Sequence, residues 1–348
     1  MQITELLTPH YEAAWLPWAV QYFFLVGMAT GAALLAAIGC WAPAHRAAAK
    51  ALPLAMVLLA VTAMSAPVSL LADLHQPARF WHFYAYFTPW SWMSRGALLL
   101  PLFVTLALSL CVAWWFDRKT WMRVISALLV VSTISIVIYT GAEIAVVRSR
   151  PLWSNPWVPV NLALTAWLAT VGAMLILTLW MPAGRDAQVR LWLGKLGLGL
   201  SAALLLVAVI WMGSGIALKT PSFQSALYIY THFPVWRISM WMSSILGAGV
   251  LVMWCLPQLW LHSKSKTVAL GIAVCAAAWG FRWALFMGVQ GVPKFGAGLC
   301  VSHAPLGGGG LTGTVGVFAP CAARATLLPR GLERWPQRSP IAGQLHAV

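Results

Sequence analysis

The chain has 348 residues, of which 61% are hydrophobic and 8% are charged, and its formal net charge is +15. This composition, with the apolar residues in long uninterrupted blocks, excludes an ordinary soluble globular domain and predicts a protein that crosses a membrane several times. The blocks do not alternate apolar and polar residues as barrel strands do. They therefore predict an all-α fold, a polytopic transmembrane helix bundle.

Eight blocks are long enough to cross a bilayer, which takes roughly 20 helical residues. In chain order we expect spans at about 15–40, 51–72, 96–116, 124–142, 157–181, 196–218, 238–261 and 268–289. Residues 1–14 contain Glu5 and Glu12 and lack the basic segment of a signal peptide. The first span is therefore expected to remain in the protein as a membrane helix.

Lys and Arg are more frequent in the odd-numbered connecting loops than in the even-numbered ones. The odd loops hold Arg46, Lys50, Arg118, Lys119, Arg123, Arg185, Arg190, Lys195, Lys264 and Lys266, and the even loops hold Arg79, Arg95, Arg148, Arg150, Lys219 and Arg237. Cytoplasmic loops carry the excess of basic residues, so we expect the N-terminus on the outer, periplasmic side. The positive net charge is then explained by the orientation of the protein in the membrane. We expect it to contact the lipid bilayer and to bind no nucleic acid.

By this orientation the outer loops are the segments 72–96, 139–157 and 219–237, which are rich in Trp, Tyr, His and Pro. An interfacial aromatic belt accounts for most of these residues. It accounts less well for Asp73 and Glu143, at the outer ends of the second and fourth spans, or for Arg282, inside the eighth. Ionisable groups at this depth are either site residues or structural, as in an ion pair or a snorkelling arginine.

The His and Cys positions give no pattern for a metal centre. The histidines lie at span ends or in loops, and the six cysteines show no CxxC pairing. A haem held by two histidines needs them inside facing helices, and zinc or iron–sulfur sites need clustered cysteines. We therefore expect no haem, no iron–sulfur cluster and no other metal in this chain. No phosphate-binding loop is present either.

Several long segments carry a resemblance to a known family. They are "WLPWAVQYFFLVGMATGAAL" (15–34), "ADLHQPARFWHFY" (72–84) with "TPWSWMSRGALLLPLF" (88–103), "IYTGAEIAVVRSRPLW" (138–153) and "FRWALFMGVQGVPKF" (281–295). Together they resemble the NrfD/PsrC family of membrane subunits, and within it the tetrathionate reductase branch. The resemblance covers most of the first 295 residues.

The resemblance implies the quinol-oxidising membrane subunit of a three-part enzyme in the bacterial cytoplasmic (inner) membrane. Such subunits oxidise menaquinol or ubiquinol and pass electrons to a ferredoxin-like iron–sulfur subunit. That subunit feeds a molybdopterin catalytic subunit on the periplasmic face. Tetrathionate is the expected acceptor, with polysulfide or thiosulfate as alternatives. A secondary transporter and a purely structural anchor are the other classes that the spans alone would allow.

The resemblance also guides the expected site residues, because quinol oxidation needs proton acceptors and hydrogen-bonding groups. Asp73 or Glu143 would accept protons and His75 and His82 would relay them. The expected quinol-binding residues are Tyr84, Tyr139, Arg79, Arg282 and Gln21. Arg79 would alternatively pair with a carboxylate or contact the partner subunit.

The C-terminal segment departs from the pattern of the family. Members of this branch continue into a ninth apolar span, whereas residues 291–348 are rich in Gly, Pro and Arg. A weak ninth span at about 306–323 with a basic tail is one interpretation. Divergence or a shifted reading frame is another.

Overall fold

The computed structural model describes residues 15, 17–74, 76–290, 316 and 321. The predicted N-terminal extension at 1–14 lies outside the described residues. So does the predicted ninth span at about 306–323, apart from Gly316 and Cys321.

The described residues form helices and no strand, which confirms the all-α prediction. The spanning helices are α1 (Pro17–Trp41), α3 (Leu52–Asp73), α5 (Trp92–Trp115), α6 (Lys119–Ala145), α7 (Trp157–Leu177), α8 (Ala187–Leu218), α10 (Pro234–Cys255) and α11 (Lys264–Trp283), the last continued by a π-helical turn, η4 (Ala284–Gly288). Short helices in the connections are α2 (Ala47–Lys50), η1 (Pro77–Arg79), α4 (His82–Ala85), η2 (Pro182–Arg185), α9 (Pro221–His232) and η3 (Pro257–Leu259). Eight helices of the described part are long and apolar enough to cross a membrane, as predicted.

Two spans differ most from their expected bounds. The sixth, expected from residue 196, begins at Ala187, because Asp186 caps α8 by accepting a hydrogen bond from the Gln188 amide. Basic residues in its first turns lower the local hydropathy without breaking the helix. The seventh, expected to continue to residue 261, ends at Cys255, where Pro257 starts a 3₁₀ turn.

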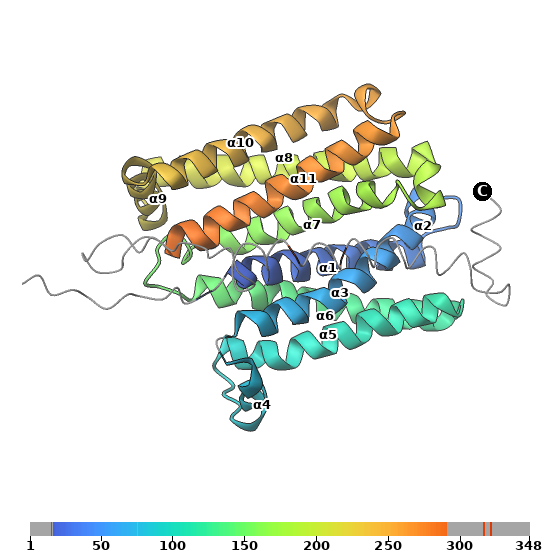
Figure 1. Cartoon of the computed structure of the whole chain (residues 1–348), viewed down its shortest axis with the longest axis horizontal. Coiled ribbons are helices and arrows are strands. Elements are labelled where there is room, and N and C mark those ends of the chain that lie inside the picture. The colour runs from blue at the N-terminus through green and yellow to red at the C-terminus, as the bar shows by residue number, and fades with distance from the viewer. Residues whose placement is uncertain (1–14, 16, 75, 291–315, 317–320, 322–348) are drawn as a thin grey trace, which may run out of the picture.

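The spanning helices pack as two groups of four. Helices α1, α3, α5 and α6 form one group and α7, α8, α10 and α11 the other, and α1 joins them by contacting α3, α6, α7 and α11 (Figure 1). Small residues allow the close approach of α1 to α7: Gly27 faces Ala166, and Gly31 faces Thr170. Helix α1 is therefore the central helix of the bundle, and groups near its N-terminal end meet side chains from several elements.

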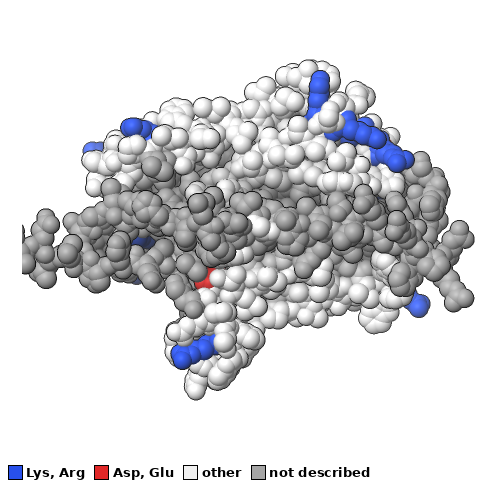
Figure 2. All heavy atoms as spheres, in the orientation of Figure 1, with Lys and Arg blue, Asp and Glu red and all other residues white. Residues whose placement is uncertain are grey.

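The connections alternate between the two ends of the bundle. Helices α4 and α9 lie at one end, and α2 lies at the other (Figure 1). On the face drawn in Figure 2, Lys and Arg side chains lie toward these two ends. This is the distribution expected when a hydrocarbon layer surrounds the middle of the bundle.

One apolar groove lies on the side of the bundle between α3 and α11. Its volume is about 410 Å³, and its floor is formed by α1 residues such as Leu25 and Met28. Cys321 also lines it, with its Sγ 3.3 Å from the Ser65 hydroxyl of α3. At least this residue of the C-terminal segment therefore contacts the bundle.

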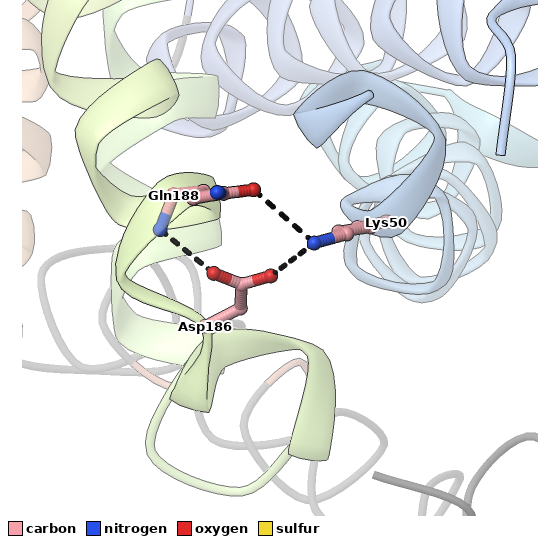
Figure 3. Close-up of polar contacts among 3 residues, drawn as sticks. All are labelled: Lys50, Asp186 and Gln188. Atoms are coloured by element: carbon pink, nitrogen blue, oxygen red, sulfur yellow. Dashed lines mark hydrogen bonds and ion pairs between the residues drawn. The ribbon is translucent and has the colours of Figure 1, made fainter. Parts of the chain in front are cut away.

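An ion pair at the end that carries α2 joins the two helix groups. Lys50 Nζ lies 2.8 Å from Asp186 Oδ2 and 3.2 Å from Gln188 Oε1, while the Gln188 amide donates to Asp186 Oδ1 over 2.8 Å (Figure 3). The hydrogen bond from Lys50 is the largest cause that holds the pKa of Asp186 below its usual value. This stabilisation is present above the unfolded-state pKa of about 3.9 and is lost as the pH falls through the lower folded-state pKa.

We expect Asp186→Asn to change stability little and Asp186→Ala to lower it more. Asparagine caps helices as well as aspartate does, so only the partly exposed ion pair is lost, which is worth roughly 0.2–1 kcal/mol. Alanine removes the cap as well, at a further cost of about 1 kcal/mol. Thermal unfolding of the solubilised protein at neutral pH measures both. Equal effects of the two substitutions would contradict the capping role.

Candidate functional site

The candidate site lies where four helix ends meet. The N-terminal parts of α1 and α5 and the C-terminal parts of α3 and α6 lie at one end of the bundle, because successive spans run in opposite directions. This is the end that carries α4 (Figure 1). Polar side chains at those helix ends therefore come together although they are far apart in the sequence.

Tyr22, Tyr139, Glu143 and Asp73 make up this site, which we call the acidic–tyrosine cluster. Tyr139 and Glu143 lie one turn apart on α6, and Tyr139 interacts with the Glu143 carboxyl and with Tyr22 of α1. Asp73, the last residue of α3, lies within electrostatic range of Glu143. Tyr22 and Tyr139 are 1% and 3% exposed, so the two phenols are shielded from solvent.

Oε2 of Glu143 is buried and has no hydrogen-bond partner within the described part of the chain. The buried hydroxyl of Tyr22 interacts with Tyr139 but makes no hydrogen bond of regular geometry with a described residue. A buried polar atom without a partner costs about 1–3 kcal/mol, and native proteins rarely leave one without a reason. A carboxylate oxygen and a phenol with unused capacity are suited to bind a ligand that carries hydroxyl groups.

Gly96 of α5 gives the cluster its shape. A Cβ atom placed there would overlap Cζ and the hydroxyl of Tyr139. The ring of Tyr139 thus occupies the space that a larger residue at position 96 would fill. This glycine is needed for a close approach of α5 to α6 and leaves the Tyr139 hydroxyl beside Glu143.

Several aromatic side chains pack together beside the cluster, at the same end of the bundle. Trp15 stacks on Trp153 with ring centroids 5.1 Å apart, and Trp153 Nε1 donates to the Leu285 carbonyl over 2.8 Å. The π-helical turn η4 contains Leu285, and such a turn changes the backbone bonding of a helix locally. Gln290 holds Trp15 at this position, because its side-chain oxygen accepts a hydrogen bond from the Trp15 amide and its side-chain nitrogen donates one to the Trp15 carbonyl.

The structure brings together only some of the residues expected from the sequence. Asp73, Tyr139 and Glu143 lie in the acidic–tyrosine cluster, and Gln21 is fully buried on α1 next to Tyr22 in the sequence. His75 lies outside the described residues, so its place in the site stays a prediction.

The remaining expected residues lie elsewhere. Arg79 lies on η1 and is exposed, and Tyr84, on α4, is 46% exposed. His82 packs edge-on against Trp81 and Tyr86 in the same connection. Arg282 of α11 is buried against α7, where its guanidinium donates hydrogen bonds to Thr165 and to the Leu162 carbonyl.

Tyr22 and Gly96 are the members that sequence reasoning missed. Tyr22 lies in an apolar run, where a tyrosine is as easily read as part of the core, and a hydroxyl next to Gln21 is its only signal. Gly96 directly follows the polar segment that ends at Arg95 and gives no signal for a ring packing against it. Both depend on which helix faces which, and a single sequence does not give this.

No group of three or more His, Cys, Asp or Glu side chains suited to a metal ion occurs in the described ranges. The expectation that the chain holds no haem and no iron–sulfur cluster stays a prediction.

Comparisons with known proteins agree with the fold. The family model described as "Polysulphide reductase, NrfD" matches residues 6–294. The chain is also 36% identical over 337 residues to a tetrathionate reductase subunit of Salmonella typhimurium, a match that covers 91% of each protein. The family match includes all eight spans and every member of the acidic–tyrosine cluster. The chain therefore belongs to the NrfD family of reductase membrane subunits.

Proposed function

We propose that this chain is the quinol-oxidising membrane subunit of a reductase complex. The observation that carries the proposal is the acidic–tyrosine cluster, in which buried Tyr22 and Glu143 atoms have unused capacity for a hydrogen-bonding ligand. Membership in the NrfD family and the eight spanning helices support it, because a quinol reaches such a site from the bilayer. Menaquinol and ubiquinol share the two ring hydroxyls that this chemistry requires.

The cluster has the groups that quinol oxidation needs. One quinol hydroxyl would donate to Oε2 of Glu143, the proton acceptor, and the phenols of Tyr22 and Tyr139 would hold the ring oxygens. Asp73, within electrostatic range of Glu143, would take the proton onward toward the end of α3. His82, Arg79 and Tyr84 lie on the adjoining connection, where they would release protons or contact a partner.

The partners follow from the same proposal. The similar Salmonella protein is described as one subunit of a tetrathionate reductase, so it works with others. We propose a ferredoxin-like iron–sulfur subunit that accepts the two electrons at the cluster end, and a molybdopterin subunit that reduces the final acceptor. Tetrathionate is the proposed acceptor because of that relative. Polysulfide and thiosulfate are the alternatives.

The test is a comparison of two electron donors on the purified complex. Quinol should drive reduction of tetrathionate only when this subunit is present, whereas a reduced dye that feeds the catalytic subunit should drive it without this subunit. The same assay with polysulfide and thiosulfate identifies the acceptor. Quinol-driven turnover that survives removal of this subunit would overturn the proposal.

The proposed location is the bacterial inner membrane, with the N-terminus and the cluster on the periplasmic side. A reporter that is active only in the periplasm should be active when fused after Arg150, between α6 and α7. It should be silent when fused after Lys119, at the start of α6. The basic residues of the odd-numbered loops are the physical reason. The reverse pattern would place the cluster, and with it the partners, on the cytoplasmic side.

A further inference from the structure

Arg282 is a charged residue buried inside the spanning region. It is 1% exposed, and its guanidinium donates to Thr165 Oγ1 over 2.8 Å and to the Leu162 carbonyl over 2.6 Å. It forms no ion pair with any residue that the structure describes. A charge at this depth is costly, and such residues face the interior of a bundle for a functional reason.

A small cavity adjoins Arg282. Its volume is about 20 Å³, and its lining comes from α1, α6, α7 and α11, with the polar residues Thr30, Thr140 and Arg282. Arg282 Nε is buried and has no hydrogen-bond partner among the described residues. A cavity of roughly 10–15 Å³ holds one water that finds two or more polar partners. The cavity thus has the size and the polar groups to hold a water that hydrates the guanidinium.

This cavity lies about one turn deeper than the acidic–tyrosine cluster. Ile136 and Val137, which line the cavity, precede Tyr139 on α6, whose C-terminal part lies at the cluster, and Gly27, which faces the Arg282 guanidinium, lies five residues beyond Tyr22 on α1. Five helical residues span about 7.5 Å, so the positive charge lies on the order of 10 Å from the cluster. Among the residues that the structure describes, Arg282 is the only titratable group that lines the cavity.

We propose that Arg282 and its hydrated cavity stabilise negative charge on a quinol held at the cluster. This rests on the proposed function. Quinol first loses one proton, which passes through Glu143 and Asp73 to the aqueous phase, and becomes an anion; the anion then gives two electrons, one at a time, to the partner's iron–sulfur subunit and its second proton to the aqueous phase by the same route, leaving quinone. At an effective dielectric constant of about 20, a unit charge about 10 Å away shifts the first step roughly tenfold. Arg282 is therefore a positioning residue that acts through the field at the cluster.

Two substitutions of different kinds test this in the assembled complex. Arg282→Met removes the charge, while Thr165→Asp leaves Arg282 in place and pairs it with a carboxylate where the Thr165 hydroxyl now accepts its hydrogen bond. Each should lower quinol-driven turnover at neutral pH roughly tenfold. Raising the pH by one unit should restore the rate, because the quinol anion becomes more populated. Arg282→Lys, which keeps the charge, and Thr165→Ser, which keeps the hydroxyl, are the matched controls. Dye-driven turnover should not change.

The outcomes separate this inference from the proposed function. An unchanged rate and pH profile in an assembled Thr165→Asp complex would overturn the inference, even if Arg282→Met fails to assemble. A loss that alkali does not restore would also overturn it, because a packing defect has no such pH dependence. Absence of quinol-driven turnover in the wild-type complex would instead overturn the proposed function, and the inference with it.

Discussion

Glu143→Gln is expected to lower quinol-driven turnover by at least about tenfold, because general-base assistance is typically worth about 10²–10⁴ in rate. Glutamine has nearly the same volume, so the interaction of α6 with α1 and α5 should persist. The amide, however, accepts no proton. Asp73→Asn should act in the same direction, since Asp73 and Glu143 lie within electrostatic range of each other. The measurement is the quinol-driven rate of the purified complex at neutral pH.

Dye-driven turnover is the control for this prediction, since electrons from a dye bypass the cluster. It should stay at the wild-type level in both variants. Equal loss of quinol- and dye-driven activity would mean that the carboxylates hold the complex together. Wild-type activity with both donors would show that they take no part in proton transfer. Tyr139→Phe is the matched variant for Glu143→Gln on the same face of α6. It removes only the hydroxyl that interacts with Glu143 and leaves both carboxylates in place.

The membrane fold was predictable because it depends on composition. Uninterrupted apolar blocks of sufficient length can only be helices in a bilayer, and all eight are present. The ends of the spanning helices were less predictable where the hydropathy of the sequence disagrees with the residues that start or stop a helix. Arg190 lowers the hydropathy of the first turns of α8, yet Asp186 caps the helix before them. Pro257 ends α10 inside an apolar stretch that hydropathy alone assigns to the span.

The site was predictable only in part, because a sequence shows which groups are polar and not which helices meet. Asp73 and Glu143 stood out as rare carboxylates at the same end of two spans, and Tyr139 lies one turn from Glu143. Arg79 and Tyr84 were expected in the site as polar groups of the segment 72–96 that follows Asp73, yet they lie in an exposed connection. Tyr22 gave no such signal, because its position is decided by the packing of α1 against α6.

The packing of Gly96 provides a test of the cluster that does not depend on proton chemistry. Gly96→Ala is expected to destabilise the protein, because the added Cβ overlaps the ring of Tyr139. Overpacking of this kind costs about 1–3 kcal/mol. The ring has to move, and its hydroxyl leaves its place beside Glu143. Thermal unfolding of the solubilised protein should show the destabilisation, and quinol-driven turnover should fall with it while dye-driven turnover in the complex remains.

Gly199→Ala is the matched control, since Gly199 lies inside α8 with no atom within 4 Å of an added Cβ. Alanine is favoured over glycine by about 1 kcal/mol in a helix, so this variant should be as stable as the wild type or more stable. Because both substitutions add one methyl group to a spanning helix, a difference between them isolates the contact with Tyr139. If Gly96→Ala is as stable and as active as Gly199→Ala, then α5 and α6 do not pack closely at this position and the cluster is not shaped by this contact.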